Sequence, residues 1–136
     1  MMKLVTVAFA SLAILSTHGP GSAQPKPPES AKPLTGEQIT QQLANRTFKF
    51  VVHDAGVEAY GTSTWDSQKS KAYGDYVWGS SRGKWTKEWK VTGDKNCFRD
   101  VGTAQWECYS VHLDGMTHYE VREDGLVHSV STLVSK

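Results

Sequence analysis

The sequence has no apolar run long enough to cross a membrane as a helix. Its longest mostly apolar run, residues 4–15, falls well short of the ~20 residues that a membrane-spanning helix needs. A basic start with Lys3 precedes this run, and small residues follow it at positions 21–23. This order is typical of a secretory signal peptide. We therefore predict a signal peptide over residues 1–23, cleaved near Ala23, and a periplasmic or secreted mature protein with no transmembrane segment.

The chain also lacks an excess of charge of either sign. Once Lys3 is set aside with the signal peptide, 14 basic side chains face 14 acidic ones. A nucleic-acid binder needs a basic excess to displace counterions from phosphates, so nucleic acid is not an expected partner. The same balance disfavours capture by anionic membranes. The partner that we expect is an envelope protein or a small ligand, bound by a monomer.

Motifs that would indicate catalysis are missing as well. The sequence contains no G-x-S-x-G elbow, no HExxH and no P-loop. His53 and Asp54 are adjacent, but neighbours on a strand point to opposite faces. Asp66 and Asp75 border turns, where an aspartate commonly caps the backbone. We therefore predict no catalytic residue and no cofactor, and do not expect an enzyme.

Cysteine is scarce, because the chain has only two, Cys97 and Cys108. An even number in an oxidising compartment favours a disulfide between them over a pair of free buried thiols. A single domain of roughly a hundred residues buries a limited share of its surface, so a covalent link would contribute to its stability.

The first part of the mature chain indicates a tether followed by a helix. Residues 24–33 contain four prolines and few apolar side chains, which predicts an extended tether that packs against nothing. Thr35 and Gln38 then have the spacing of a capping box, and Leu34 and Ile39 that of a hydrophobic staple. A short helix is expected over residues 36–44, with a narrow apolar stripe that must pack on something larger.

From Thr47 onward the apolar period changes to two, which is typical of β-strands. Turn signals rich in Gly, Asp and Ser separate the strand candidates. Eight are expected, at about residues 47–52, 58–65, 73–80, 84–91, 96–100, 106–113, 117–122 and 126–133. Short, regularly spaced strands with tight turns predict an all-β fold, an antiparallel meander barrel or sandwich forming one domain over residues 34–136. The helix would plug an open end or cover an edge.

The aromatic residues supply the candidate binding surface. An eight-stranded barrel is only just wide enough for its own side chains, so we expect no generous cavity and place binding at a rim or an outer face. Trp85 and Trp89 fall on the inward face of one strand, broken only by Lys87, and are interpreted as core. The remaining candidates for ligand or partner binding are Trp65, Tyr73, Tyr76 and Trp78.

The faces on which three histidines near the C-terminus lie depend on the register of the last two hairpins. With two-residue turns, His112 and His118 would face opposite sides. With three-residue loops ending in Gly115 and Gly125, His112, His118 and His128 would share an outer face, with Tyr109 and Tyr119 inward. We favour the second register because it groups the apolar residues. Those histidines are then weak zinc candidates with Glu120, but Arg122 beside them disfavours a cation and no metal site is predicted.

Three stretches resemble a family of small exported proteobacterial proteins known only as a domain of unknown function. The family pattern is LTG-x-E, then G-x-W-x-V-x-G-D-x-x-C, then E-C-Y-x-V. It falls here on residues 34–37, on residues 83–97 with an extension between Trp85 and Trp89, and on residues 107–111. The resemblance implies an exported location and no activity. By size and disulfide the chain is also similar to bacterial lysozyme-inhibitor barrels, at the level of fold alone.

Two functions are therefore considered. The first is a non-catalytic exported β-barrel protein that binds a partner or ligand through an aromatic rim or outer face. The alternative is an inhibitor of an exported or host hydrolase, in which a protruding loop such as residues 63–73 enters the target's cleft.

Overall fold

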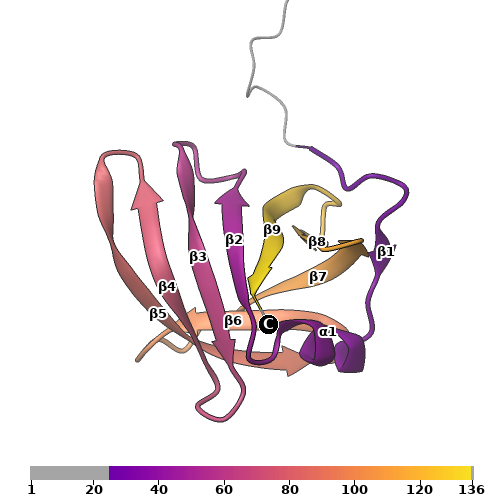
Figure 1. Ribbon diagram of the computed structural model, residues 1–136, viewed down its shortest axis with the longest axis horizontal. Coiled ribbons are helices and arrows are strands. Elements are labelled where there is room, and N and C mark those ends of the chain that lie inside the picture. The colour runs from indigo at the N-terminus through magenta and orange to yellow at the C-terminus, as the bar shows by residue number, and fades with distance from the viewer. Residues whose placement is uncertain (1–24, 136) are drawn as a thin grey trace, which may run out of the picture.

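The computed structural model describes residues 25–135, and the predicted signal peptide lies outside them (Figure 1). Within these residues there is one helix, α1 (Gly36–Leu43). The strands are β1 (Lys32–Pro33), β2 (Thr47–Val52), β3 (Ala59–Asp66), β4 (Lys71–Trp78), β5 (Ser81–Thr92), β6 (Lys95–Asp100), β7 (Glu107–Asp114), β8 (Thr117–Val121) and β9 (Val127–Ser135). No helix in this part of the chain is both long and apolar enough to span a bilayer.

Strands β2 to β9 form a closed antiparallel barrel. Each pairs with the next along the chain, and β9 returns to pair with β2. The all-β prediction is confirmed, as a barrel and not a sandwich. All eight expected strands are present within a few residues of their predicted bounds. Short β1 is a ninth strand, which pairs with Leu113 and His112 of β7, beyond the part of β7 that β6 covers.

Helix α1 closes one end of the barrel, the lower end in Figure 1. The capping box is present, because the Thr35 side chain accepts from the Gln38 backbone N–H and the Gln38 side chain accepts from the Thr35 backbone N–H. Ile39 and Leu43 project from the helix into the core and are 0% and 4% exposed. Of the two expected placements, the helix therefore plugs an end.

Large aromatic side chains fill the barrel beneath this helix. Trp65 and Trp89 meet edge to face, with ring centroids 5.4 Å apart. Phe48, Ala72, Phe98 and Val111 complete the buried cluster with the two helix residues. The prediction that Trp89 belongs to the core is confirmed.

The expectation that the proline-rich segment packs against nothing is wrong for the part that the structure describes. The Val127 N–H donates to the Pro25 carbonyl over 2.9 Å, and the Ala31 side chain is buried. Pro33 ends the short strand β1 beside β7. Proline removes donors but leaves carbonyl oxygens free, and these dock the segment onto the barrel.

The predicted register of the last two hairpins is also wrong. Leu113 pairs with His118, so the β7–β8 turn has Gly115 and Met116 as its two central residues. Gly115 has φ 61° and Gly125 has φ 85°, the left-handed values expected at both positions. At the first turn, however, the glycine begins a two-residue loop instead of ending a three-residue one. His118 consequently faces the interior, and Tyr119 faces out beside His112.

The Cys97–Cys108 disulfide is present and joins directly paired positions of β6 and β7. Cys97 is fully buried, and the described residues contain no free cysteine. The bond therefore fixes the register of these two strands.

Replacing Ile39 or Leu43 by Ala should lower the free energy of unfolding by about 2–4 kcal/mol, because each leaves a cavity between α1 and the aromatic cluster. Urea denaturation measures the change, and Gln41→Ala on the exposed side of α1 is the control. Losses below ~0.5 kcal/mol for both core variants would show that the helix is not docked.

Removing the disulfide with Cys97→Ala/Cys108→Ala should cost roughly 3 kcal/mol at most, since the bond closes a short loop in the unfolded chain. The unreduced wild-type protein should weigh less than its dithiol form by two hydrogen atoms. Reductant should destabilise the wild type and leave the double variant unchanged. Thiol labelling of the native, unreduced protein would contradict the bond.

Candidate functional site

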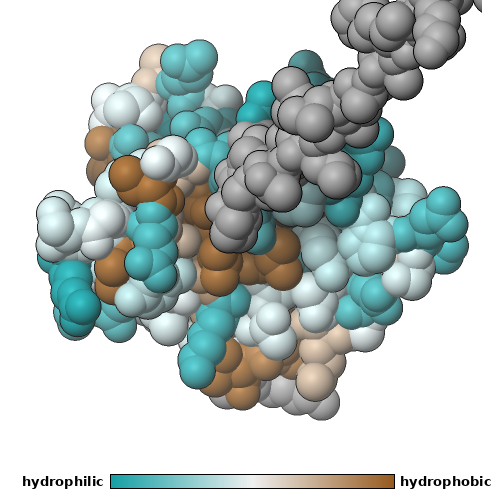
Figure 2. All heavy atoms as spheres, turned by 90° about the horizontal axis from the view of Figure 1, so that it is seen from above, coloured by the Kyte–Doolittle hydropathy of each residue, from teal (hydrophilic) through white to brown (hydrophobic). Residues whose placement is uncertain are grey.

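The end of the barrel opposite α1 contains a pocket of about 500 Å³. It lies where β2 and β4 end and where β3 and β9 begin. Figure 2 looks onto this end and shows hydrophobic side chains toward the middle of the face, between more hydrophilic ones. The residues that line it include Phe50, Asp54, Ala59, Ser63, Trp65, Tyr76, Trp78, Trp85, Lys87, Phe98, Glu107, Tyr109, Glu120, His128, Ser129 and Ser131.

The pocket corrects the expectation that the barrel is too narrow for a sizeable cavity. The reason lies in the size of the inward residues near this end. On β3 and β9 they are small: Ala59, Gly61, Ser63, Ser129 and Ser131. Strand number sets the radius of a barrel, but the volume that remains inside depends on the side chains that point inward.

Aromatic side chains form much of the apolar wall. Phe50 and Trp85 meet edge to face, with centroids 6.1 Å apart. Trp85 is held in place because its Nε1–H donates to the Thr62 carbonyl over 3.0 Å. Gly74, its partner on β4, permits this arrangement, since a Cβ there would lie 1.9 Å from the same carbonyl oxygen.

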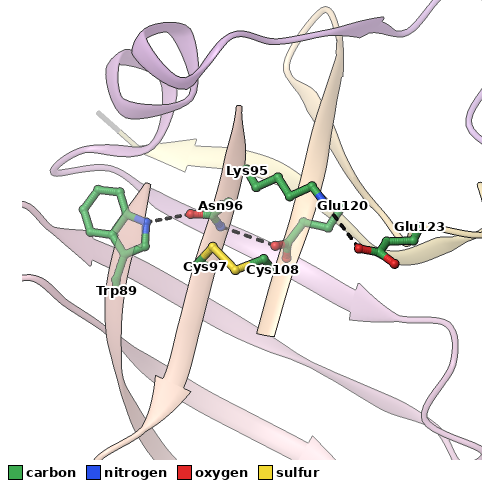
Figure 3. Close-up of a disulfide and its surroundings, with 7 residues drawn as sticks. All are labelled: Trp89, Lys95, Asn96, Cys97, Cys108, Glu120 and Glu123. Carbon is green, nitrogen blue, oxygen red and sulfur yellow. Dashed lines mark hydrogen bonds and ion pairs between the residues drawn. A yellow bond between two sulfur atoms is a disulfide. The ribbon is translucent and has the colours of Figure 1, made fainter. Parts of the chain in front are cut away.

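Glu120 is the end of a buried polar network (Figure 3). Its carboxylate accepts from the Ser129 hydroxyl over 2.8 Å and from the Asn96 side-chain amide over 3.3 Å. The Asn96 carbonyl oxygen accepts in turn from Trp89 Nε1 over 2.6 Å. Burial raises the pKa of Glu120, against the opposing effect of the His128 charge and of the hydrogen bonds from Ser129 and Asn96. The network links the helix-capped core to the pocket.

A second set of polar contacts connects the loop that follows β2 with strand β9. His128 Nδ1 and Asp54 Oδ1 are 2.6 Å apart, and the imidazole stacks on Tyr109 with centroids 4.2 Å apart. Arg122 Nη1 lies 3.6 Å from the other Asp54 oxygen. Burial, followed by the charges of Glu107, Glu120 and Asp54, raises the pKa of Tyr109.

Lys87 lines the pocket but is not among the site residues that the sequence predicts. Its Nζ lies 5.1 Å from the centroid of the Phe98 ring and 3.8 Å from Asp100 Oδ1. The feature of the sequence that could have identified it is that Lys87 is the single polar residue on the otherwise apolar face of residues 84–91. The sequence offers Glu120 and His128 only as weak zinc candidates on an outer face, whereas both line the pocket.

The four candidate binding residues are not all brought together. Tyr76 and Trp78 line the pocket, and Trp78, which is 49% exposed, lies at its mouth. Trp65 lines the pocket as well but is 6% exposed and belongs to the core cluster. Tyr73 pairs with Thr64 and Thr86 on the outer side of the barrel and is 43% exposed. Only Tyr76 and Trp78 combine pocket lining with access from solvent.

The three candidate zinc histidines do not share a face. His112 lies on the opposite side of β7 from buried Val111, His118 is buried against Phe48, and His128 lies in the pocket. Among residues 25–135 there is no group of three or more His, Cys, Asp or Glu side chains that could hold a metal ion.

Residues 63–73 form the adjoining parts of β3 and β4 and the turn between them. Asp66 accepts from the backbone N–H groups of Gln68 and Lys69, which gives it the capping role expected beside a turn. The turn is joined to the end of α1 by Asn45, whose side chain accepts from Ser67. The turn therefore lies at the helix-capped end, and none of residues 66–73 lines the pocket.

Comparison with known proteins gives no direct indication of function, because no family model, curated protein or solved structure matches the chain.

His118 should make the fold sensitive to acid. It is 3% exposed, and neither ring nitrogen has a hydrogen-bond partner among the described residues. Burial, with a smaller effect from the Arg46 charge, lowers the pKa of His118 to about 4. The folded state therefore binds the proton less readily than the unfolded state. The destabilisation is absent above the unfolded pKa of 6.5, grows as the pH falls and is complete near pH 4, where it reaches roughly 3 kcal/mol.

We expect His118→Phe to lose this part of the pH dependence. The measurement is the free energy of unfolding in urea between pH 7 and pH 4 for wild type and variant. His53→Gln, which alters an exposed histidine, should retain the wild-type slope. Parallel curves for wild type and His118→Phe would contradict the prediction.

Proposed function

We propose that this protein is an exported, non-catalytic binding protein whose ligand is a small molecule held in the pocket at the open end of the barrel. The observation that carries the proposal is the difference between the two ends. One is sealed by α1 over an aromatic core, and the other retains a volume of about 500 Å³ with an aromatic wall. This volume falls within the range of ordinary ligand sites, which combine apolar walls with a few polar groups.

The aromatic mouth of the pocket supports binding of a planar or apolar group. Tyr76 and Trp78 point to the same side of β4, as their spacing requires, and both line the pocket. An exposed indole beside an opening provides a large contact area at low entropic cost. The proposed aromatic rim is therefore Tyr76 and Trp78, with Trp85 below them and Tyr73 excluded.

Export is part of the proposal. The disulfide between Cys97 and Cys108 is the kind of bond that persists in oxidising compartments, and the N-terminal sequence pattern points the same way. The alternative, inhibition of a hydrolase through residues 63–73, has less support, because that turn is short and is braced by Asn45 instead of by the disulfide.

Titration with N-phenyl-1-naphthylamine, an uncharged fluorescent probe of apolar sites, tests the proposal. We expect a saturable rise in fluorescence at one site per chain. Trp78→Ala should weaken probe binding by about tenfold, because it removes the exposed wall of the pocket mouth.

Tyr73→Ala is the matched control, since it also removes an exposed aromatic side chain but from the outer surface. It should bind the probe as the wild type does. Equal losses in the two variants, or no saturable binding by the wild type, would contradict a pocket ligand.

A further inference from the structure

Three carboxylates line the pocket. Asp54, Glu107 and Glu120 all line it, and all three act electrostatically on the Tyr109 hydroxyl. They come from three separate parts of the barrel: the loop after β2, the start of β7 and the end of β8. Resting on the function proposed above, we propose that the ligand is an organic cation, an amine or quaternary ammonium with an apolar or aromatic body.

The cations near the pocket already have counter-charges. Asp54 contacts both His128 and Arg122. Lys87 lies between the face of Phe98 and the carboxylate of Asp100. In contrast, the ion pairs formed within residues 25–135 include none with Glu107 or Glu120. The charges of His128 and Lys87 act on Glu120 without a direct ion pair, so Glu107 and Glu120 are the carboxylates that an incoming cation would contact.

Glu120 has capacity for a further donor. Its two oxygens accept one hydrogen bond each, both from the neutral groups of Ser129 and Asn96. An ionised carboxylate has about four acceptor positions, so two hydrogen bonds leave positions unused. A buried carboxylate bonded only to neutral donors is costly, and a ligand ammonium would reduce that cost.

The walls suit the rest of such a ligand. Faces of Trp and Tyr rings attract cations at distances up to about 6 Å, and Tyr76, Trp78 and Trp85 line the same pocket. Their apolar surface would bury the body of the ligand while the charged head reaches inward to Glu120.

An independent observation marks the pocket as a place for a ligand. Ser63 lines it and is 3% exposed, yet its hydroxyl has no hydrogen-bond partner among the described residues. A buried hydroxyl without a partner is unfavourable, and such groups are rare in folded proteins. A polar atom of a bound ligand would satisfy it.

Three probes with the same body and different charge test the proposal: 2-(1-naphthyl)ethylamine, 2-(1-naphthyl)ethanol and 1-naphthylacetate. Calorimetric titration at pH 7.5 should show the amine binding about tenfold more tightly than the alcohol, with the carboxylate the weakest. Equal affinities for the amine and the alcohol, or tighter binding of the carboxylate, would overturn the preference for a cation.

Substitutions locate the charge that is responsible. Glu120→Gln should bring the amine to the affinity of the alcohol while the alcohol is unaffected. Glu123→Gln is the control, because that carboxylate is exposed and pairs with Lys95 outside the pocket (Figure 3). Glu107→Gln, at an exposed position that should tolerate the change, gives a second reading and should reduce the preference for the amine in part.

The outcomes separate this inference from the proposed function. Saturable binding of the uncharged fluorescent probe with no preference for the amine would leave a pocket that binds small molecules and overturn the cationic ligand. An unchanged amine-to-alcohol ratio in both Glu107→Gln and Glu120→Gln would overturn it as well. Failure of the fluorescent probe and of all three naphthyl compounds would overturn both.

Discussion

Closure of the barrel, through the pairing of β9 with β2, is the constraint on which the other features depend. Closure removes the free edges of the sheet and fixes the radius of the barrel. Whether each end is filled or leaves a pocket then depends on the side chains that point inward. At one end these are large rings, and α1 adds Ile39 and Leu43 over them. At the other end the inward residues of β3 and β9 are small, and a pocket remains. One barrel thus has a stabilising end and an open end.

The disulfide matters for the pocket as well as for stability. Asn96 and Cys97 on β6 pair with Tyr109 and Cys108 on β7. A fixed register here sets the height at which the Asn96 amide reaches Glu120 (Figure 3). It also sets the position at which Tyr109 stacks on His128. A slip between β6 and β7 would turn these side chains to the other face, since side chains alternate along a strand.

The sequence predicted the architecture well, because its signals were local. The capping box at Thr35, the period-two patterns and the turn glycines each depend on a few neighbouring residues, and they gave the helix and eight strands within a few positions. The cysteine pair added one contact between neighbouring strands, which followed from the number of cysteines and the expected compartment.

The candidate site was harder to predict, because it depends on register and on volume. Choosing the β7–β8 register by grouping apolar residues placed His118 outside, whereas the two-residue turn at Gly115 places it inside. Apolar grouping fails where a polar residue is buried, and β8 carries two such residues on one face. Tyr73 and Tyr76 are close in sequence, but an odd separation puts them on opposite faces, so proximity along the chain was a poor guide.

His118 and Glu120, the two ionisable residues on the inner face of β8, show how the ends of the barrel differ. Burial favours the neutral form of each, so it lowers the pKa of the histidine and raises that of the glutamate. His118 packs against Phe48 of the core cluster and does not line the pocket. Glu120, two residues further on, lines the pocket and is oriented by Ser129 and Asn96. Burying either polar side chain in the interior costs stability. Only the carboxyl group of Glu120 lies where a small molecule that enters the open end could reach it.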